Sequence, residues 1–313
     1  MKSVEVIVPG LLTTVQDLGR PGSGTAGVSP SGAADAISLR AGNRLVGNAA
    51  GAAALEMTLL GGSFLFHDAT VVALAGADFA ATLDGTPVGL WSSLKVRGGA
   101  TLRLGATRSG ARCYLCVAGG FQVQEFLGSS STHILSGTGG FKGRALRKGD
   151  VLATGGARLP LPARRLAAKA LEVLSPRKVL RVTEGPQSKL FSGAARKAFT
   201  GGAYRLTEAC DRMGLRLEGA AVKTSREVSL ISEGVSLGAV QITAAGLPII
   251  LFVEQQTAGG YPKIANVISA DMHCVGQLRP RDEIRFALVT FAMARKLFLE
   301  QEKLMSSAEL LEE

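Results

Sequence analysis

Residues 247–265 read LPIILFVEQQTAGGYPKIA, and this stretch decides both the fold class and the position of the strongest candidate site. Its first part, residues 247–253, is rich in the β-branched and aromatic residues of a buried strand. Polar residues 254–257, a Gly-Gly pair, Tyr261 and Lys263 follow directly. A hairpin turn needs Gly-Gly but not the amides, hydroxyls and ammonium around it, and loops on rigid strand ends commonly carry binding groups. The stretch therefore predicts a β-strand that leads into a functional loop.

Most of the chain shares the pattern of half-buried strands, in which apolar and polar residues alternate in short runs broken by glycine. The clearest further strands are expected at residues 70–76, 100–105, 112–118, 179–183 and 283–286. Helical periodicity is rarer, and it is found at residues 33–46, 188–199 and 291–311. Ser31 is a candidate N-cap of the first of these helices, and Gly47 is its stop. Closely spaced strands with few helices favour barrels or sandwiches, so we expect a mainly β chain with a few helices.

The composition limits the class of protein. The 313 residues suffice for roughly two domains. With 46% hydrophobic residues the chain is too apolar for a disordered protein, yet it has no uninterrupted apolar run of about 18 residues to span a bilayer. Its first residues lack the apolar core of a signal peptide, and four cysteines make no disulfide framework in so long a chain. We expect a soluble, cytoplasmic protein with no membrane partner.

The net charge of +10 is concentrated in residues 158–181, which hold seven Lys or Arg residues and one Glu. A basic run of this kind is typical of a solvated linker or helix face. No nucleic-acid-binding motif and no aromatic stacking platform accompanies it. We therefore expect no nucleic-acid partner.

A faint duplication divides the chain. The same offset of 177 residues separates Pro9 from Pro186, Glu56 from Glu233 and Gly61 from Gly238. The pattern predicts two related β-rich domains, residues 1–157 and 179–290, joined by a basic linker at 158–178. A C-terminal amphipathic helix at 291–313 follows them.

Several familiar chemistries are absent. No phosphate-binding P-loop motif occurs, and the Gly-rich stretch 137–143 misses the dinucleotide motif because Lys142 occupies its last glycine position, so a turn is favoured there over a phosphate nest. The three histidines are far apart and have no metal-ligand spacing, so we expect no metal site. Cys113 and Cys116 form a CxxC inside a strand pattern, where residues three apart face opposite ways, and we interpret them as core residues.

Three further polar clusters stand out in apolar surroundings. The first is a turn with Gln16, Asp17 and Arg20, in which the aspartate and the arginine could simply pair with each other. The second places Ser31 and Asp35 at a helix start, where exposed N–H groups attract anions, although capping alone would explain the serine. The third, Asp211-Arg212, sets an acid beside a guanidinium just before a glycine.

These clusters resemble one known family. The resemblance is carried, in order, by VPGLLTTVQDLGR at 8–20, SGAAD at 31–35, AGNRLVGN at 41–48, LEMT at 55–58, DRMGLRL at 211–217, GAVQ at 238–241, QTAGGYPKIA at 256–265 and ISAD at 268–271. The chain resembles the family of the C component of bacterial 5-oxoprolinase, also called KipA, allophanate hydrolase subunit 2 or biotin-dependent carboxyltransferase-like protein. Residues 280–282 read Pro-Arg-Asp where the family has Pro-Gly-Asp, which suggests a different turn, and Gly276-Gln277 replaces Ala-Gln.

The resemblance implies two cyclophilin-like β-barrel domains and a place in an enzyme complex. Family members work with two partners, a LamB/YcsF-type subunit (the A component) and a KipI-like subunit (the B component). The assembly is an amidohydrolase that opens 5-oxo-L-proline to L-glutamate at the expense of ATP. This chain has no nucleotide motif of its own, so ATP is assigned to the complex. It also lacks a biotin-attachment motif, so any biotin would come from elsewhere.

We expect the polar residues of these clusters to line one shared cleft. Asp35, Asp211 and Lys263 are the catalytic candidates, with an aspartate as the base or the group that orients water and Lys263, with Arg212, at the substrate carboxylate or a phosphate. The substrate-binding candidates are Gln16, Arg20, Ser31, Arg212, Gln241, Gln256, Thr257, Gly259, Gly260 and Tyr261.

Two other functions stay open. The chain could be a carboxyltransferase component that moves a carboxyl group from carboxybiotin to an amide or urea nitrogen. It could also be a non-catalytic antagonist that binds a KipI-like inhibitor of a kinase.

Overall fold

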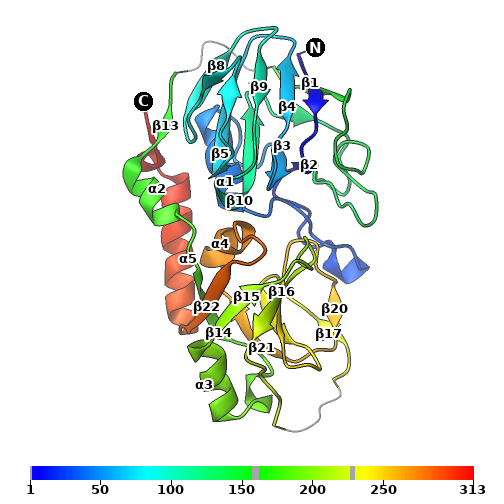
Figure 1. The fold of residues 1–313 in the computed structure, drawn as a ribbon, viewed down its shortest axis with the longest axis vertical. Helices are drawn as coiled ribbons and strands as arrows, with labels where there is room; N and C mark the ends of the chain where they lie inside the picture. Colours follow the sequence, from blue (N-terminus) through cyan, green and yellow to red (C-terminus); the bar gives the residue numbers. More distant parts are fainter. Residues whose placement is uncertain (1, 157–161, 226–229) are drawn as a thin grey trace. The chain divides into compact units, whose positions relative to one another are not determined.

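The structure, a computed structural model, describes residues 2–156, 162–225 and 230–313. The chain forms two compact units. The first unit contains Ser31–Ser175, the preceding residues up to Arg20 and Leu304–Glu313, and the second contains Pro21–Pro30 and Pro176–Lys303. The expectation of a mainly β chain with a few helices is confirmed (Figure 1). No helix among the described residues is long and apolar enough to cross a bilayer.

The first unit is built on two sheets, in which β1, β4 and β9 lie side by side in one and β3, β10 and β5 in the other. The larger sheet has the strand order β11 (Phe121–Gln122), β12 (Val151–Thr154), β1 (Ser3–Val8), β4 (Ser63–Phe66), β9 (Thr101–Arg103), β6 (Thr82–Leu83) and β7 (Thr86–Pro87). The smaller sheet has the order β2 (Leu12–Gln16), β3 (Ala54–Thr58), β10 (Ser109–Val117), β5 (Thr70–Asp78) and β8 (Ser93–Val96).

Strand β10 shows why the sequence folds in this way. Its alternate residues Cys113, Leu115 and Val117 are buried in the main hydrophobic core of the unit. The residues between them, Tyr114 and Cys116, are buried in a second core on the other face. Because a strand points successive side chains to opposite faces, an uninterrupted apolar run serves both cores. The prediction that the two cysteines face opposite ways is confirmed, and burial raises the pKa of both thiols.

Helix α1 (Ala36–Leu45) covers the smaller sheet. A side chain at Gly42 would meet Cys116 Sγ at 2.7 Å, so the helix lies directly against β10. The N-cap of α1 is Asp35, whose carboxylate accepts a hydrogen bond from the N–H of Ser38, and not Ser31 as the sequence suggested. Ser31 instead lies four residues earlier in a left-handed conformation, and its hydroxyl donates to Thr132 O.

The basic segment contains more regular structure than a linker. Residues 158–161 lie outside the described part, but α2 (Ala168–Leu174) follows, and β13 (Arg165–Leu166) pairs with β23 (Leu311–Glu312). Arg177 and Arg181 both pair with the carboxylate of Asp271. Part of the positive charge is therefore neutralised within the chain.

The second unit is a closed barrel, in which the parallel pair β14 and β22 completes an otherwise antiparallel ring. Its strands follow the order β14 (Val179–Glu184), β21 (Lys263–Val267), β18 (Ala239–Ile242), β19 (Pro248–Leu251), β16 (Gly214–Gly219), β15 (Ala203–Leu206) and β22 (Glu283–Leu288). A small ribbon of β17 (Glu233–Gly234) and β20 (Ala258–Gly259) accompanies the barrel.

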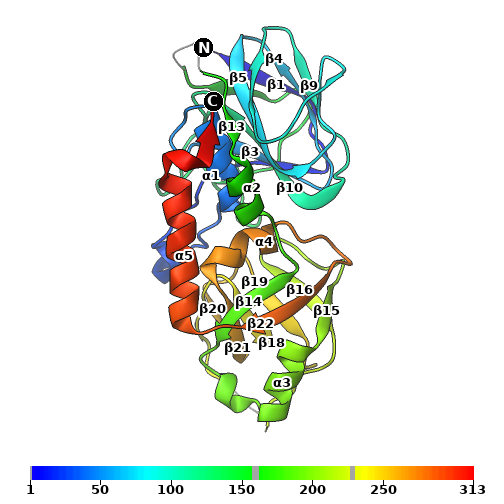
Figure 2. The ribbon, with the colours of Figure 1, turned by 90° about the vertical axis from the view of Figure 1, so that its left-hand side faces the viewer.

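Helix α3 (Gly193–Gly201) packs against the barrel (Figure 2). Phe199 of this helix stacks on Phe286 of β22, with the ring centroids 4.5 Å apart. The remaining helices are α4 (Met272–Gly276) and α5 (Phe291–Ser306), and short 3₁₀ turns occupy Ser23–Ala26, Ser188–Leu190, Ser269–Asp271 and Ala308–Leu310. The three helices expected from sequence periodicity are all present.

The turn before β22 corrects one expectation. Arg281 has a φ of +71°, the left-handed conformation that glycine adopts most easily. Its N–H donates to Leu206 O, and its guanidinium pairs with the exposed Glu208. The arginine therefore takes the backbone conformation of a glycine, and the sequence difference at 281 does not require a different turn.

Because a side chain at positive φ is strained, Arg281→Gly is expected to be more stable than Arg281→Ala by about 1 kcal/mol. Both variants lose the exposed ion pair with Glu208, so the comparison isolates the backbone conformation. Urea-induced unfolding of the two variants measures the difference. Equal stabilities would show that the turn carries no such strain.

Candidate functional site

A group of polar side chains in the second unit surrounds the buried Lys263. Strands β18 and β21 pair Gln241 with Lys263, and residues directly opposite each other on antiparallel strands point to the same face. Both side chains are buried, and Gln241 Nε2 has no hydrogen-bond partner among the described residues. A buried ammonium and a buried amide donor on one face form a site for an oxygen-rich group.

A carboxylate lies against this ammonium. Lys263 Nζ is 2.7 Å from Glu233 Oε1, and the lysine side chain is only 4% exposed while the glutamate is 49% exposed. Gln187 joins the two, because its Nε2 donates to Glu233 Oε1 at 2.6 Å and its Oε1 accepts from the N–H of Lys263. The ammonium of Lys263, and after it the hydrogen bond from Gln187, lowers the pKa of Glu233. We call Gln187, Glu233, Gln241, Gly259 and Lys263 the Lys263 cluster.

Gly259 belongs to the cluster because its backbone lies against the Gln241 side chain and leaves no room for a side chain of its own. It pairs with Glu233 across the β17–β20 ribbon, and a side chain there would meet Gln241 Nε2 at 2.8 Å and Gln256 Nε2 at 3.3 Å. The predicted loop therefore brings Gln256 and Gly259 to Gln241. Of the predicted loop residues, Thr257 and Gly259 are half-buried, and Gln256, Gly260 and Tyr261 are exposed.

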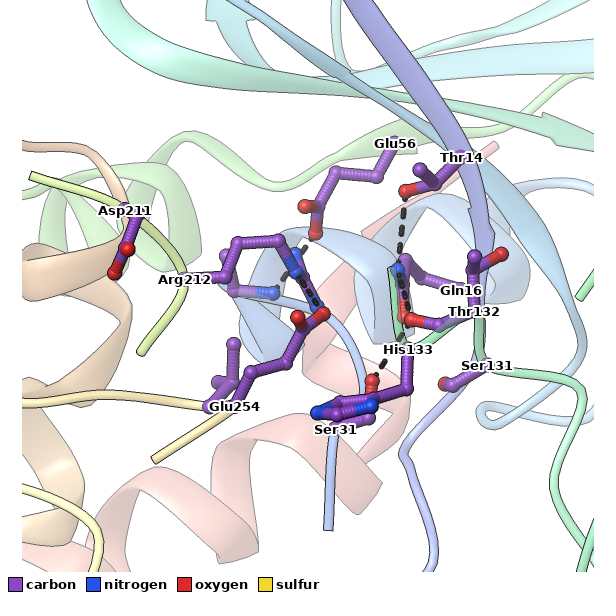
Figure 3. A network of polar contacts seen from close by, with 12 residues as sticks. Thr14, Gln16, Ser31, Glu56, Ser131, Thr132, His133, Asp211, Arg212 and Glu254 are labelled. Carbon is purple, nitrogen blue, oxygen red and sulfur yellow. Dashed lines mark hydrogen bonds and ion pairs between the residues drawn. The ribbon is translucent and has the colours of Figure 1, made fainter. Parts of the chain in front are cut away.

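Arg212 and Asp211 are neighbours in the sequence but differ in burial and in their hydrogen-bond partners. Arg212 is buried and its Nε donates to Glu254 Oε1, the ion pair drawn in Figure 3. Asp211 is exposed, and its Oδ1 accepts the N–H groups of Met213 and Gly214 at 2.8 and 3.0 Å. The aspartate thereby shapes the turn that leads into β16 while its other oxygen accepts no hydrogen bond from a described residue.

In the first unit, Gln16 and Ser31 meet at one carbonyl. Gln16 Nε2 donates to Thr132 O at 3.1 Å and to Thr14 Oγ1 at 3.0 Å, and Ser31 Oγ donates to Thr132 O at 2.9 Å (Figure 3). Gln16 Oε1 is buried and accepts no hydrogen bond from a described residue. Two predicted site residues more than ten positions apart are thus brought together by the segment at residue 132.

Arg20 and Asp17 do not pair with each other. Arg20 is buried, donates to the carbonyl oxygens of Ser131 and Phe126, and lies over the Phe126 ring. Asp17 accepts hydrogen bonds from Ser129 Oγ, from the N–H of Ser130 and from Ser131 Oγ. Both side chains therefore fasten the same loop, 126–131, to the turn after β2.

Asp35 lies in a buried network of the first unit. Its carboxylate accepts from the N–H of Ser38 at 2.9 Å and from Ser38 Oγ at 2.6 Å. Its own N–H donates to the Tyr114 hydroxyl, which donates in turn to Glu56 Oε2 at 2.6 Å. Burial and then the charge of Glu56 hold the pKa of Tyr114 well above its ordinary value.

The predicted residues therefore form local groups in each unit. In the second unit the structure brings Gln241, Gln256, Gly259 and Lys263 together, and in the first it brings Gln16 to Ser31. Asp35 belongs to the first unit, and Asp211 and Lys263 to the second, so a cleft shared by all three stays a prediction.

Sequence reasoning missed Gln187, Glu233 and Glu254 as site residues. The one available signal was the duplication, which matches Glu233 with Glu56, and both glutamates accept hydrogen bonds from buried groups. Among the described residues, no group of three or more His, Cys, Asp or Glu side chains could hold a metal ion.

Known proteins are similar to this chain in sequence and in fold. Residues 26–288 match the family described as carboxyltransferase domain, subdomain A and B. The chain is 37% identical over 300 residues to the C subunit of 5-oxoprolinase from Escherichia coli K12, covering 96% of each protein.

The chain belongs to this carboxyltransferase-domain family.

Other relatives differ in length. The crystal structure of the urea amidolyase from K. lactis superimposes with a TM-score of 0.90 and 34% identity over 99% of this chain, which spans only 20% of the amidolyase. The C subunit of 5-oxoprolinase from Haemophilus influenzae is 36% identical over 91% of this chain and 90% of its own. The family thus includes both separate subunits of this length and parts of multidomain enzymes.

The Lys263 cluster predicts a specific titration. A pKa held low by Lys263 means that the ion pair is complete above the ordinary glutamate pKa and is lost as the pH falls through the lower pKa of the folded protein. In Lys263→Met the pKa of Glu233 is expected to rise toward the ordinary value, as followed by carboxyl ¹³C NMR. The control Lys197→Met, which removes an exposed lysine of α3, leaves it in place. An unchanged Glu233 titration in Lys263→Met would show that the pair does not control this carboxylate.

Proposed function

We propose that the chain is a subunit of an ATP-dependent 5-oxoprolinase and works with two partner subunits, one of the LamB/YcsF type and one like KipI. The observation that carries the proposal is the similarity to the C subunit of the Escherichia coli 5-oxoprolinase. The two sequences are 37% identical, and the match covers 96% of both chains. The amidolyase relative supports the fold equally well but contains this chain as a fifth of its length. A separate subunit is thus the better match to the whole chain.

The reaction explains the need for ATP. A five-membered lactam is a stabilised amide that water attacks poorly. Transfer of the terminal phosphoryl group of ATP to the carbonyl oxygen releases ADP and makes the ring carbon more electrophilic. Water adds to that carbon, and the C–N bond then breaks as the nitrogen takes up a proton. The acyl phosphate that results is hydrolysed by a second water to glutamate and phosphate. Catalysis in such a step consists largely of positioning and of stabilising charge. ATP is proposed to bind to the assembly, and biotin has no part in this reaction.

The Lys263 cluster is the proposed anion-binding part of the site. The ammonium of Lys263 and the amide of Gln241 would hold the carboxylate of 5-oxoproline or a phosphate oxygen, since charge-assisted hydrogen bonds are the stronger kind. Glu233 is half exposed and supplies the negative charge in the isolated chain. A bound anion would replace this carboxylate, and no buried ammonium would be left without a counter-charge.

Asp211 is the stronger of the two candidates for a base. Both carboxylate oxygens of Asp35 accept hydrogen bonds from Ser38, which fits a capping role. Asp211 is exposed and has only Oδ1 engaged with described residues. Arg212, the next residue in the sequence, is buried and paired with Glu254.

Carboxyl transfer from carboxybiotin to an amide or urea is the second candidate. It is favoured by the 34% identity and the TM-score of 0.90 to the urea amidolyase. In that case the same buried donors would hold the carboxyl group during transfer. Dependence of turnover on a biotinylated partner, in place of 5-oxoproline and ATP, distinguishes the two.

The test uses the chain co-purified with both partner subunits. Lys263→Met is expected to keep the fold and to lower kcat/KM for glutamate formation from 5-oxoproline and ATP by about 10- to 150-fold, the effect of losing one charged hydrogen bond. Asp211→Asn keeps an acceptor for the Met213 and Gly214 amides but removes the base, so the same loss is expected in kcat.

The controls Lys197→Met and Glu218→Gln remove the same charges from exposed positions of α3 and β16 and should retain full turnover. Wild-type turnover in both Lys263→Met and Asp211→Asn would reject the assignment of these residues. Absence of glutamate formation by the wild-type assembly would reject the proposed function itself.

A further inference from the structure

A hollow of about 520 Å³ lies in the first unit, and none of the residues assigned above to substrate lines it. It is lined by residues 122–126, which begin at the last residue of β11, and by the Gly-rich segment 137–143. The sequence favoured a simple turn for this segment. The structure adds a cavity of ligand size to it, with an aromatic side chain on each wall, Phe126 and Phe141.

Several residues of the Gly-rich segment have a left-handed backbone conformation. Gly139, Gly140 and Lys142 all have positive φ, of +66°, +57° and +57°. Glycine is required at 139 and 140 because a side chain would collide with Ser131 O and with Thr132. None of the N–H groups of residues 139–142 donates a hydrogen bond to another described residue. Successive amides in such turns form concavities that bind anions.

Positive side chains surround the same amides. Lys142 lines the hollow, is exposed and has its ammonium 5.1 Å from the centre of the Phe141 ring. The buried guanidinium of Arg20 lies directly beneath the glycines, since a side chain at Gly139 would come within 2.8 Å of its Nη2. Arg144 is tied to Asp150 by two hydrogen bonds, and Glu125 is the acidic residue of the lining. The lining itself holds one cation, Lys142, and one acid, Glu125, and Arg20 adds a positive charge beneath Gly139.

We propose that this hollow binds a small phosphorylated molecule. The phosphate would accept hydrogen bonds from the N–H groups of residues 139–142 and from the Lys142 ammonium. A phosphate presents three acceptor oxygens to such an array, whereas a carboxylate presents two. The organic part would lie against Phe126 and Phe141. The site is independent of the proposed function, because it uses no residue of the Lys263 cluster.

The test is an NMR titration of the ¹⁵N-labelled full chain with phenyl phosphate at neutral pH. The amide signals of residues 139–142 are expected to shift with saturation, because their N–H groups bind the phosphate directly. Lys142→Glu should weaken the binding by at least about tenfold, because it removes one charged hydrogen bond and replaces the attraction with a repulsion. The matched control Lys95→Glu makes the same charge change on β8, where the lysine is exposed, and should bind as the wild type does.

Benzoate, which offers the same ring with a carboxylate, separates the two anion chemistries. Weaker shifts with benzoate than with phenyl phosphate support a phosphate site. The proposal is overturned if phenyl phosphate leaves the signals of residues 139–142 unmoved, if Lys142→Glu binds as well as Lys95→Glu, or if benzoate binds as tightly as phenyl phosphate. None of these outcomes depends on catalysis, so they do not bear on the 5-oxoprolinase proposal.

Discussion

A buried ammonium requires a counter-charge, and in this protein the ammonium of Lys263 obtains it from a carboxylate that is half exposed. Removing a charge from water is costly unless it is paired and hydrogen-bonded. Glu233 satisfies this requirement through a 2.7 Å contact, and Gln187 holds both partners from a third segment. Because Glu233 remains accessible, another anion can take its place without leaving the lysine uncompensated. The pair thus satisfies the buried ammonium in the isolated chain, and under the proposed function an anionic substrate would take the place of Glu233.

A buried charge in the first unit, the carboxylate of Glu56, is stabilised by hydrogen bonds. Glu56, which the predicted duplication matches with Glu233, accepts hydrogen bonds from the Tyr114 hydroxyl and from the N–H of Ala34. There the glutamate is buried and serves the start of α1, whereas Glu233 lies on a short ribbon at the surface. The two matched glutamates therefore have unequal exposure, and only the one in the second unit is open to exchange with a ligand.

Sequence patterns predicted the elements of this fold well because burial enforces them locally. The alternation at β10 specifies two cores, and the strand at residues 247–253 leads into the polar loop as expected. Capping was harder to predict, since Ser31 and Asp35 are both good caps and only the backbone shows which one adjoins the helix. At Arg281 the side chain gave no sign that the backbone takes a glycine-like conformation.

The partners within the site were less predictable for a different reason. Lys263 and Gln241 were recognised from their polar neighbourhoods, but Glu233 reaches Lys263 through the two-residue ribbon of β17 and β20, which has no sequence signature. Gln187 reaches the pair from the turn after β14. Likewise, the proposed phosphate site at residues 139–142 depends on the φ angles of these residues and on a cavity wall contributed by residues 122–126. Such contacts join segments distant in the chain, and periodicity does not report them.

The most direct test of this account is a crystal structure of the three-subunit assembly with 5-oxo-L-proline and a non-hydrolysable ATP analogue. The account predicts that an anionic oxygen of the substrate or of the nucleotide lies about 2.7–3.2 Å from Lys263 Nζ, with the Glu233 carboxylate displaced from it. A structure with both ligands bound elsewhere and the Lys263–Glu233 pair intact would contradict it.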